Sequence, residues 1–179
     1  MKIALIIFSV VILGLLSFLA YLGFFKRPVI TTKVVGPYKI IYKDHVGPYQ
    51  ETGKIQDDIY EYLIKEHNLE TYKGIGVYYD NPKKVPAEKL RSKAGCIIEP
   101  KDMDQNIRLT GTYKVMTIAG QPMIYAEFPF KSKLSIMVGI MKVYPLLESY
   151  CEQKDLKFRE SMEIYDIPNK KIVYLMPTK

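Results

Sequence analysis

The sequence predicts an α+β domain with a duplicated strand-helix-strand-strand unit, an antiparallel sheet and two helices, preceded by one transmembrane helix. Three observations lead to this prediction. An apolar run opens the chain, and strand-like and helix-like segments then follow in an order that occurs twice. The string Tyr79-Asp80-Asn81-Pro82 also returns, 86 positions later, as Tyr165-Asp166-Ile167-Pro168. Repetition on this scale indicates two copies of one supersecondary unit.

The apolar run covers residues 3–25 and contains no charged side chain. A helix rises about 1.5 Å per residue, so a run of this length crosses a bilayer core of roughly 30 Å. Secretory signals have a shorter apolar stretch and end at a small-residue cleavage site, whereas Lys26-Arg27 follows here. We expect an uncleaved anchor at residues 1–27 and a domain at residues 28–179; a cleaved signal and a buried core helix are the alternatives.

The distribution of charged residues indicates on which side of the membrane the domain lies and which partners the chain binds. Lys2 alone precedes the run, whereas Lys26, Arg27, Lys33 and Lys39 follow it, and basic flanks stay in the cytoplasm. We therefore expect a single-pass membrane protein with a cytoplasmic domain. The formal net charge of +7 favours attraction to an anionic lipid membrane. Because the lysines are spread along the whole sequence, we expect no nucleic-acid partner.

The two cysteines, Cys96 and Cys151, lie in apolar surroundings. Their expected role is that of small buried hydrophobic residues in a reducing compartment. A single disulfide between them is the alternative if the domain faces outward.

The first repeat begins after a short connector, residues 27–36. Residues 39–46 are rich in β-branched and aromatic side chains and predict a strand. Thr52 is expected to cap the next helix, which has an apolar face and a polar face. Residues 74–79 and 95–99 predict two further strands. The apolar face carries Ile55, Ile59, Tyr62 and Leu63, and the polar face carries Lys54, Asp57, Asp58 and Glu61.

The second repeat has the same order. Its extended segments are residues 112–118 with 123–128, its helical stretch is residues 132–153, and its last strands are residues 160–165 and 171–175. Gly139 and Pro145 interrupt the helical stretch, and Pro145 is expected to kink or divide it.

Sequence signatures of catalysis and cofactor binding are weak. The stretch from Gly47 to Lys54 resembles a phosphate loop but has five residues between its glycines, and Ile55 follows it where a Ser or Thr would bind magnesium. His45 and His67 have no second ligand at metal-binding spacing, and no Gly-x-Ser-x-Gly elbow occurs. We expect no catalytic residue, no cofactor and no metal.

Fifteen tyrosines and no tryptophan stand out in the composition. A groove lined by tyrosines and one carboxylate suits flat or cationic organic molecules, through stacking, cation–π attraction and charge pairing. Glu163, between Met162 and Ile164 in a predicted strand, is our candidate carboxylate. A solvent-facing strand glutamate is the alternative.

Several blocks together resemble the GyrI-like small-molecule-binding domains, and within them the membrane-anchored, testis-expressed ER-phagy receptors. The blocks are YKDHVGPY (residues 42–49), GVYYDNP (76–82), FPF (128–130), VYP (143–145) and MEIY (162–165). The resemblance implies two halves of the strand-helix-strand-strand type, called SHS2, with an aromatic ligand groove at their junction. In relatives an acidic residue lies on a strand reading Glu-x-Tyr, which only Glu163 and Tyr165 match. We add Tyr49 and Tyr79 by their positions in the repeat.

Three functions follow as hypotheses. The first is a sensor or binding module that holds a small amphipathic or cationic organic ligand, with Glu163 as the counter-charge. The second is a membrane-tethered adaptor that recruits a protein partner; the long carboxy-terminal tail of the ER-phagy receptors has no counterpart in this sequence. The third is a hydrolase of electrophilic compounds, which would need Glu163 with a raised pKa.

Overall fold

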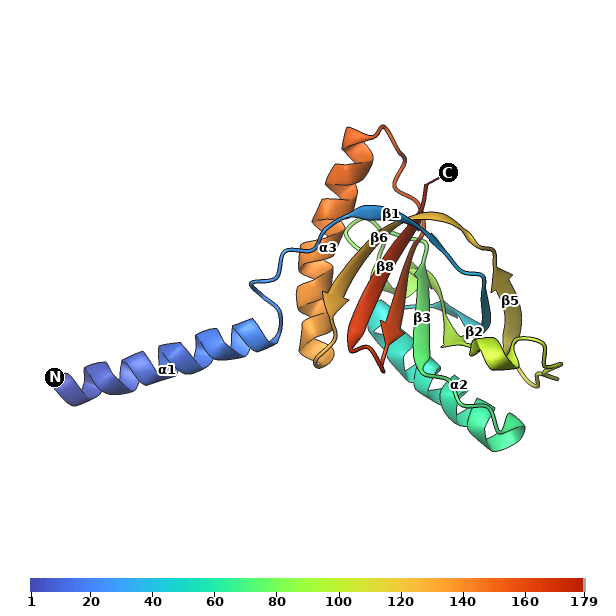
Figure 1. Cartoon of the computed structure of the whole chain (residues 1–179), viewed down its shortest axis with the longest axis horizontal. Helices are drawn as coiled ribbons and strands as arrows, with labels where there is room; N and C mark the ends of the chain where they lie inside the picture. Colours follow the sequence, from blue (N-terminus) through green and yellow to red (C-terminus); the bar gives the residue numbers. More distant parts are fainter. Residues whose placement is uncertain (179) are drawn as a thin grey trace.

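The computed structural model describes residues 1–178 and contains three α-helices and eight strands (Figure 1). The expected antiparallel α+β architecture is confirmed, with strand order β1-β6-β8-β7-β3-β4-β2-β5. The helices are α1 (Lys2–Tyr21), α2 (Thr52–His67) and α3 (Lys133–Gln153), and the strands are β1 (Thr31–Val35), β2 (Tyr38–Val46), β3 (Lys73–Tyr78), β4 (Arg91–Ile97), β5 (Lys114–Ile118), β6 (Gln121–Pro129), β7 (Ser161–Asp166) and β8 (Lys171–Pro177).

The predicted duplication is present as two halves, β2-α2-β3-β4 and β6-α3-β7-β8, which meet where β3 pairs with β7 at the centre of the sheet. Each half is also preceded by an edge strand that pairs with the other half. β1 precedes the first half and pairs with β6, whereas β5 precedes the second half and pairs with β2. The halves are therefore joined at both edges as well as at the centre.

The expectation of a connector over residues 27–36 is wrong in part, because Thr31–Val35 forms β1. This strand pairs with Gln121–Tyr125 of β6, far along the chain. Its composition, TTKVV, is typical of a strand. The partner, however, is too distant in sequence for local patterns to reveal it.

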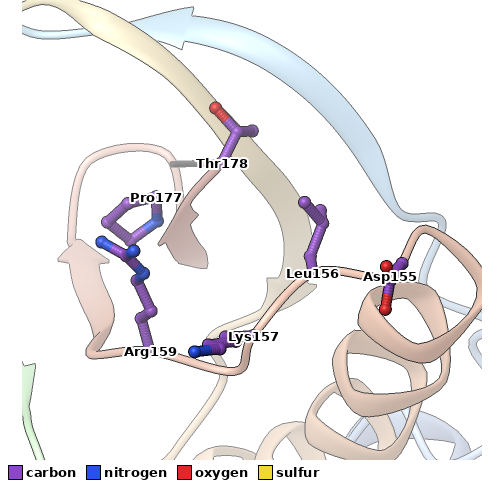
Figure 2. Close-up of a pocket in the computed structure, with 6 residues that line it drawn as sticks. All are labelled: Asp155, Leu156, Lys157, Arg159, Pro177 and Thr178. Atoms are coloured by element: carbon purple, nitrogen blue, oxygen red, sulfur yellow. The ribbon is translucent and has the colours of Figure 1, made fainter.

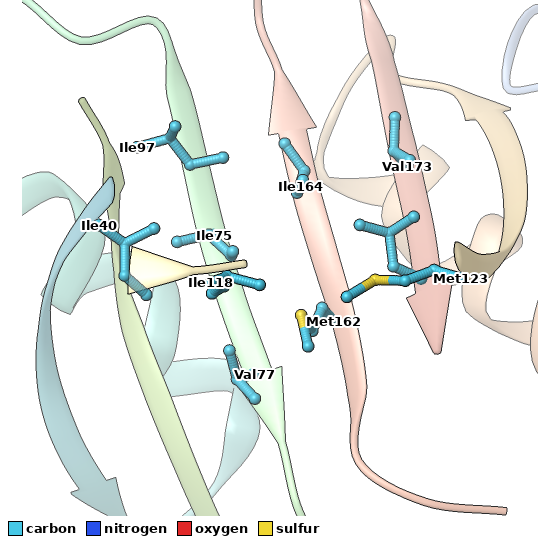
Figure 3. Close-up of a cluster of buried hydrophobic side chains, with 10 residues drawn as sticks. Ile40, Ile75, Val77, Ile97, Ile118, Met123, Met162, Ile164 and Val173 are labelled. Carbon is cyan, nitrogen blue, oxygen red and sulfur yellow. The ribbon is translucent and has the colours of Figure 1, made fainter. Parts of the chain in front are cut away.

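The sheet curls, and the face away from the helices packs on itself (Figure 3). Successive side chains of a strand point to opposite faces, so Ile40 joins this cluster while its neighbour Ile41 packs under α2. The core on the inner face consists of Ile40, Ile75, Val77, Ile97, Ile118, Met123, Met162, Ile164, Val173 and Leu175.

α2 covers the first half, with Ile59 and Leu63 packed against the sheet and the predicted polar face exposed. The expected cap by Thr52 is wrong. A short 3₁₀ turn, Tyr49–Glu51, leads into the helix, so Glu51 takes the cap position. Thr52 is already helical, and its hydroxyl donates to the Tyr49 carbonyl at 2.7 Å.

α3 covers the second half as one continuous helix, so the expected division at Pro145 does not occur. Proline removes one helical hydrogen bond, to the carbonyl four residues earlier. Here that carbonyl belongs to the exposed Met141, and Pro145 is itself exposed, so water can solvate the free carbonyl. Ser132 and Ser135 form a capping box at the start of the helix.

Gly139 lets α3 approach the sheet closely, since a Cβ at this position would collide with the Tyr174 hydroxyl. Cys96 and Cys151 are free and buried in the two helix-sheet clusters, which agrees with their expected packing role.

α1 projects away from the rest of the molecule (Figure 1). None of its residues is buried, its mean hydropathy is 2.9, and it is long and apolar enough to cross a membrane. An N-terminal signal sequence can also be long and apolar enough to meet this criterion. The chain rejoins the domain immediately after the helix, because Leu22 is only 5% exposed and Gly23 lies against the Phe128 ring.

Candidate ligand-binding groove

A groove of about 2060 Å³ lies between α2 and α3 on the helix-bearing face of the sheet. α2 and α3 form its two walls, and the central strands β3 and β7 contribute its floor. Small-molecule sites usually measure about 300–1,000 Å³, so the groove is open enough for a ligand longer than one drug-sized molecule.

Glu163 lies in the floor of this groove and is only 2% exposed. The alternative of a solvent-facing strand glutamate is therefore wrong. The Tyr165 hydroxyl donates to Oε2 at 2.6 Å and the Tyr144 hydroxyl donates to Oε1 at 2.8 Å. Burial raises the pKa of Glu163, and the two phenol hydrogen bonds oppose this by stabilising the charged form.

Further hydroxyl groups surround this carboxylate. The Tyr78 hydroxyl lies 3.4 Å from the Thr52 hydroxyl and 3.5 Å from that of Tyr165, and the Tyr144 hydroxyl lies 3.0 Å from Ser161 Oγ. Burial, together with the charge of Glu163, raises the pKa values of Tyr78, Tyr144 and Tyr165. These phenols therefore stay neutral and act as hydrogen-bond donors at physiological pH.

A glycine makes room for this cluster. Gly76 of β3 is the direct neighbour of Glu163 across the central strand pair. A Cβ on Gly76 would collide with the Tyr78 hydroxyl, which lies over it. The missing side chain thus allows the Tyr78 phenol to lie in the floor beside the carboxylate.

The four predicted residues all border the groove but occupy different places. Glu163 and Tyr165 are in direct contact. The Tyr49 ring lies 4.7 Å from that of Tyr78, centroid to centroid. Tyr79 follows the end of β3, is 39% exposed and has Lys93 Nζ 5.2 Å from its ring centroid. It lies at the margin, away from Glu163.

The Tyr49 hydroxyl is occupied by the backbone, because it donates to the Asp80 carbonyl at 2.9 Å. Its ring borders the groove. Asp80 is in turn held by Arg91, whose Nη2 and Nε lie 2.8 and 3.0 Å from the two carboxylate oxygens. This bidentate pair fixes the loop after β3 at the end of the groove.

Sequence reasoning missed Tyr78 and Tyr144. Gly76 is the cross-strand neighbour of Glu163, so Tyr78, two residues along β3, lies on the same face as Glu163 and Tyr165. Tyr79, which the offset of 86 selected, is one residue further along and follows the end of β3. Tyr144 was visible only as part of the VYP block in the helical stretch.

Two buried groups near the groove lack a hydrogen-bond partner within residues 1–178. They are the Tyr174 hydroxyl and Gln56 Nε2. Tyr174 is the cross-strand neighbour of Glu163, and Gln56 lines the α2 wall. A buried unpaired donor is costly, so Gln56, which lines the groove, is available to a ligand that carries an acceptor, whereas the Tyr174 hydroxyl lies under α3 beside Gly139.

A second hollow, of about 150 Å³, lies between the end of α3 and the end of β8 (Figure 2). It is lined by Lys157, Arg159 and Pro177, among others, and has no direct contact with Glu163. Its volume is below that of usual organic-ligand sites, so the larger groove is the candidate site.

The chain is similar to two curated mammalian proteins. It is 29% identical over 162 residues to testis-expressed protein 264 of Homo sapiens, covering 86% of this chain and 50% of that protein. It is 30% identical over 132 residues to the testis-expressed protein 264 homolog of Mus musculus, covering 70% of this chain and 41% of that protein. The chain thus spans half or less of these relatives.

Solved structures share the fold at low identity. The EcmrR chain in a complex with DNA has a TM-score of 0.63 at 11% identity, covering 98% of this chain and 68% of that one. The structure of SAV2435 bound to tetraphenylphosphonium has a TM-score of 0.51 at 11% identity, covering 84% and 94%. These likenesses concern the fold alone.

One neighbour was therefore solved with DNA, although we expected no nucleic-acid partner for this chain. The family model of the GyrI-like small molecule binding domain matches residues 29–175, nearly the whole chain after α1. The curled antiparallel sheet with two helices and the groove between them agree with that match. The chain belongs to the GyrI-like small-molecule-binding domain family.

Proposed function

We propose that this protein is a membrane-anchored GyrI-like module that binds a small amphipathic or cationic organic ligand in the groove between α2 and α3. α1 serves as a single-pass anchor within residues 1–27, and residues 28–179 form the binding domain on the cytoplasmic side. The basic residues that follow the apolar run support this orientation.

The observation that carries the proposal is the buried Glu163 carboxylate with its two phenol donors. A buried carboxylate is costly unless it is paired with an opposite charge. An organic cation would supply that charge, while the rings of Tyr49, Tyr78 and Tyr165 would supply flat apolar contact and cation–π attraction. Tyr79 would contact only the part of a ligand that reaches the margin.

Titration of tetraphenylphosphonium into the full chain, held in lipid nanodiscs, tests the proposal. Heat of binding is measured by calorimetry, with empty nanodiscs subtracted. We expect saturable binding that weakens about tenfold or more in Glu163→Gln, because a lost charge-assisted contact costs on the order of 1.5–3 kcal/mol.

The matched control is Glu148→Gln, the same change on the α3 wall of the same groove. We expect it to retain most of the affinity, since within residues 1–178 no hydrogen bond joins Glu148 to Glu163, Tyr144 or Tyr165. Equal losses in the two variants would show a general charge effect and remove the assigned role of Glu163. Absence of saturable binding would count against an organic cation as the ligand.

A membrane-tethered adaptor is the second candidate function. The size of the groove supports it, because about 2060 Å³ also accommodates an extended segment of a protein partner. Affinity capture that enriches one stoichiometric partner, and that Glu163→Gln leaves unchanged, would favour the adaptor over the small-molecule module.

A further inference from the structure

α3 carries an exposed apolar ridge at the margin of the groove, away from the buried floor. Leu134, Met137 and Met141 are 50%, 61% and 70% exposed. Their spacing of three and four residues places them on one stripe of the helix. A solvent-facing helix side usually carries polar residues instead. We call these three residues the α3 ridge.

The ridge is held close to the end of α1. Lys142 of α3 donates to the Lys26 carbonyl at 3.1 Å, and its Nζ lies 5.2 Å from the Phe24 ring centroid. Leu22 is buried directly after α1. No linker separates the apolar helix from the domain, and Figure 1 shows α1 leaving the domain beside α3. A bilayer that contains α1 would therefore lie next to α3.

Charges around the ridge match an anionic surface. Lys131 and Lys133 are exposed at the start of α3, and Lys26 and Arg27 are exposed after α1. Basic residues next to a membrane span attract anionic lipid by about 1 kcal/mol each. Exposed Phe25 adds an aromatic side chain of the kind found at membrane interfaces.

We propose that the α3 ridge rests on the anionic lipid surface in which α1 is inserted. Met137 and Met141 also line the groove, so its α3 wall opens at the bilayer and an amphipathic ligand enters from the lipid. This proposal rests on the anchoring role of α1 in the proposed function.

The lack of native tryptophan makes a direct test available. Single-tryptophan variants of the full chain are reconstituted into phosphatidylglycerol vesicles with brominated acyl chains, which quench nearby tryptophan. The variants are Met141→Trp on the ridge and Tyr60→Trp, which is 41% exposed on the α2 wall of the same groove. Phe8→Trp within α1 reports insertion of the anchor. Because these side chains are exposed, the substitutions leave the core unchanged.

We expect loss of emission for Phe8→Trp and Met141→Trp and none for Tyr60→Trp, relative to unbrominated vesicles. Quenching of Phe8→Trp alone would overturn the ridge contact and leave the anchor in place. Equal quenching of Met141→Trp and Tyr60→Trp would also overturn it, because a brominated lipid inside the groove reaches both walls. If Phe8→Trp were unquenched, the anchor and the ridge contact would both fail.

Discussion

Glu163 combines burial with a charge that the folded state disfavours. Its carboxylate has two phenol donors and no basic partner among the contacts within residues 1–178. Burial raises its pKa above the unfolded value, with the hydrogen bonds from Tyr165 and Tyr144 acting in the opposite direction. Sites arranged for binding commonly sacrifice stability in this way. The loss of folding stability caused by burying the Glu163 carboxylate thus supports a role for this residue in ligand recognition.

The pH dependence of stability follows from this shift. A pKa raised on folding gives stability that is present below the unfolded pKa, about 4.3 for glutamate, and is lost as pH rises through the folded pKa. Glu163→Gln has no such loss. We expect Glu163→Gln and the parent chain to unfold at similar urea concentrations in acid, and Glu163→Gln to be the more stable at neutral pH. An equal difference at both pH values would contradict the assigned shift.

The same residues show where sequence reasoning succeeds. The Glu-x-Tyr strand placed Glu163 and Tyr165 together, because alternate strand residues share a face. Tyr79 was chosen from an offset of 86, whereas the strand pairing places Tyr78 on the face of Glu163. Only the register of β3 with β7, a contact between distant segments, shows that Tyr78 shares the face of Glu163.

At the scale of the elements, the periodic patterns identified both amphipathic helices and most strands. They missed β1, whose partner β6 is remote in sequence. They also predicted that Pro145 would kink or divide the second helix, whereas α3 is undivided there. Local patterns indicate which secondary structure a segment favours. Edge-strand pairing and helix continuity depend in addition on contacts with distant segments and on solvent exposure.

Two helical glycines give a matched prediction. A Cβ at Gly139 in α3 would collide with Tyr174 and lie 3.0 Å from Phe128, whereas a Cβ at Gly53 in α2 would meet nothing within 4 Å. We expect Gly139→Ala to lower the free energy of unfolding by about 1–3 kcal/mol through overpacking. Gly53→Ala should leave it unchanged or raise it by up to about 1 kcal/mol. Urea unfolding of both variants measures this; similar values would refute close packing of α3.

At the scale of the whole molecule, the groove belongs to both halves. β3 and α2 come from the first half, while β7 and α3 come from the second. The exchanged edge strands β1 and β5 tie the halves together. A ligand in the floor therefore touches both halves and stabilises their association by mass action.

The exposure of Leu22 bears on where the folded domain begins. We expected a boundary between residues 27 and 28, yet Leu22 is only 5% exposed whereas Phe25 is 59% exposed. In a chain that lacks residues 2–20, we expect Leu22→Ala to lower the free energy of unfolding by about 2 kcal/mol, the low end for a buried leucine. Phe25→Ala should change it by less than about 0.5 kcal/mol, as surface substitutions do.

Urea unfolding of the two variants decides between the boundaries. A clear loss only in Leu22→Ala means that the domain begins where α1 ends, so the anchor and the groove form one rigid unit. Negligible losses in both variants would restore residues 22–27 to the anchor segment. That result would also argue against a rigid attachment of the α3 ridge beside the membrane. Residues 22–27 would then be a connection that does not pack on the domain.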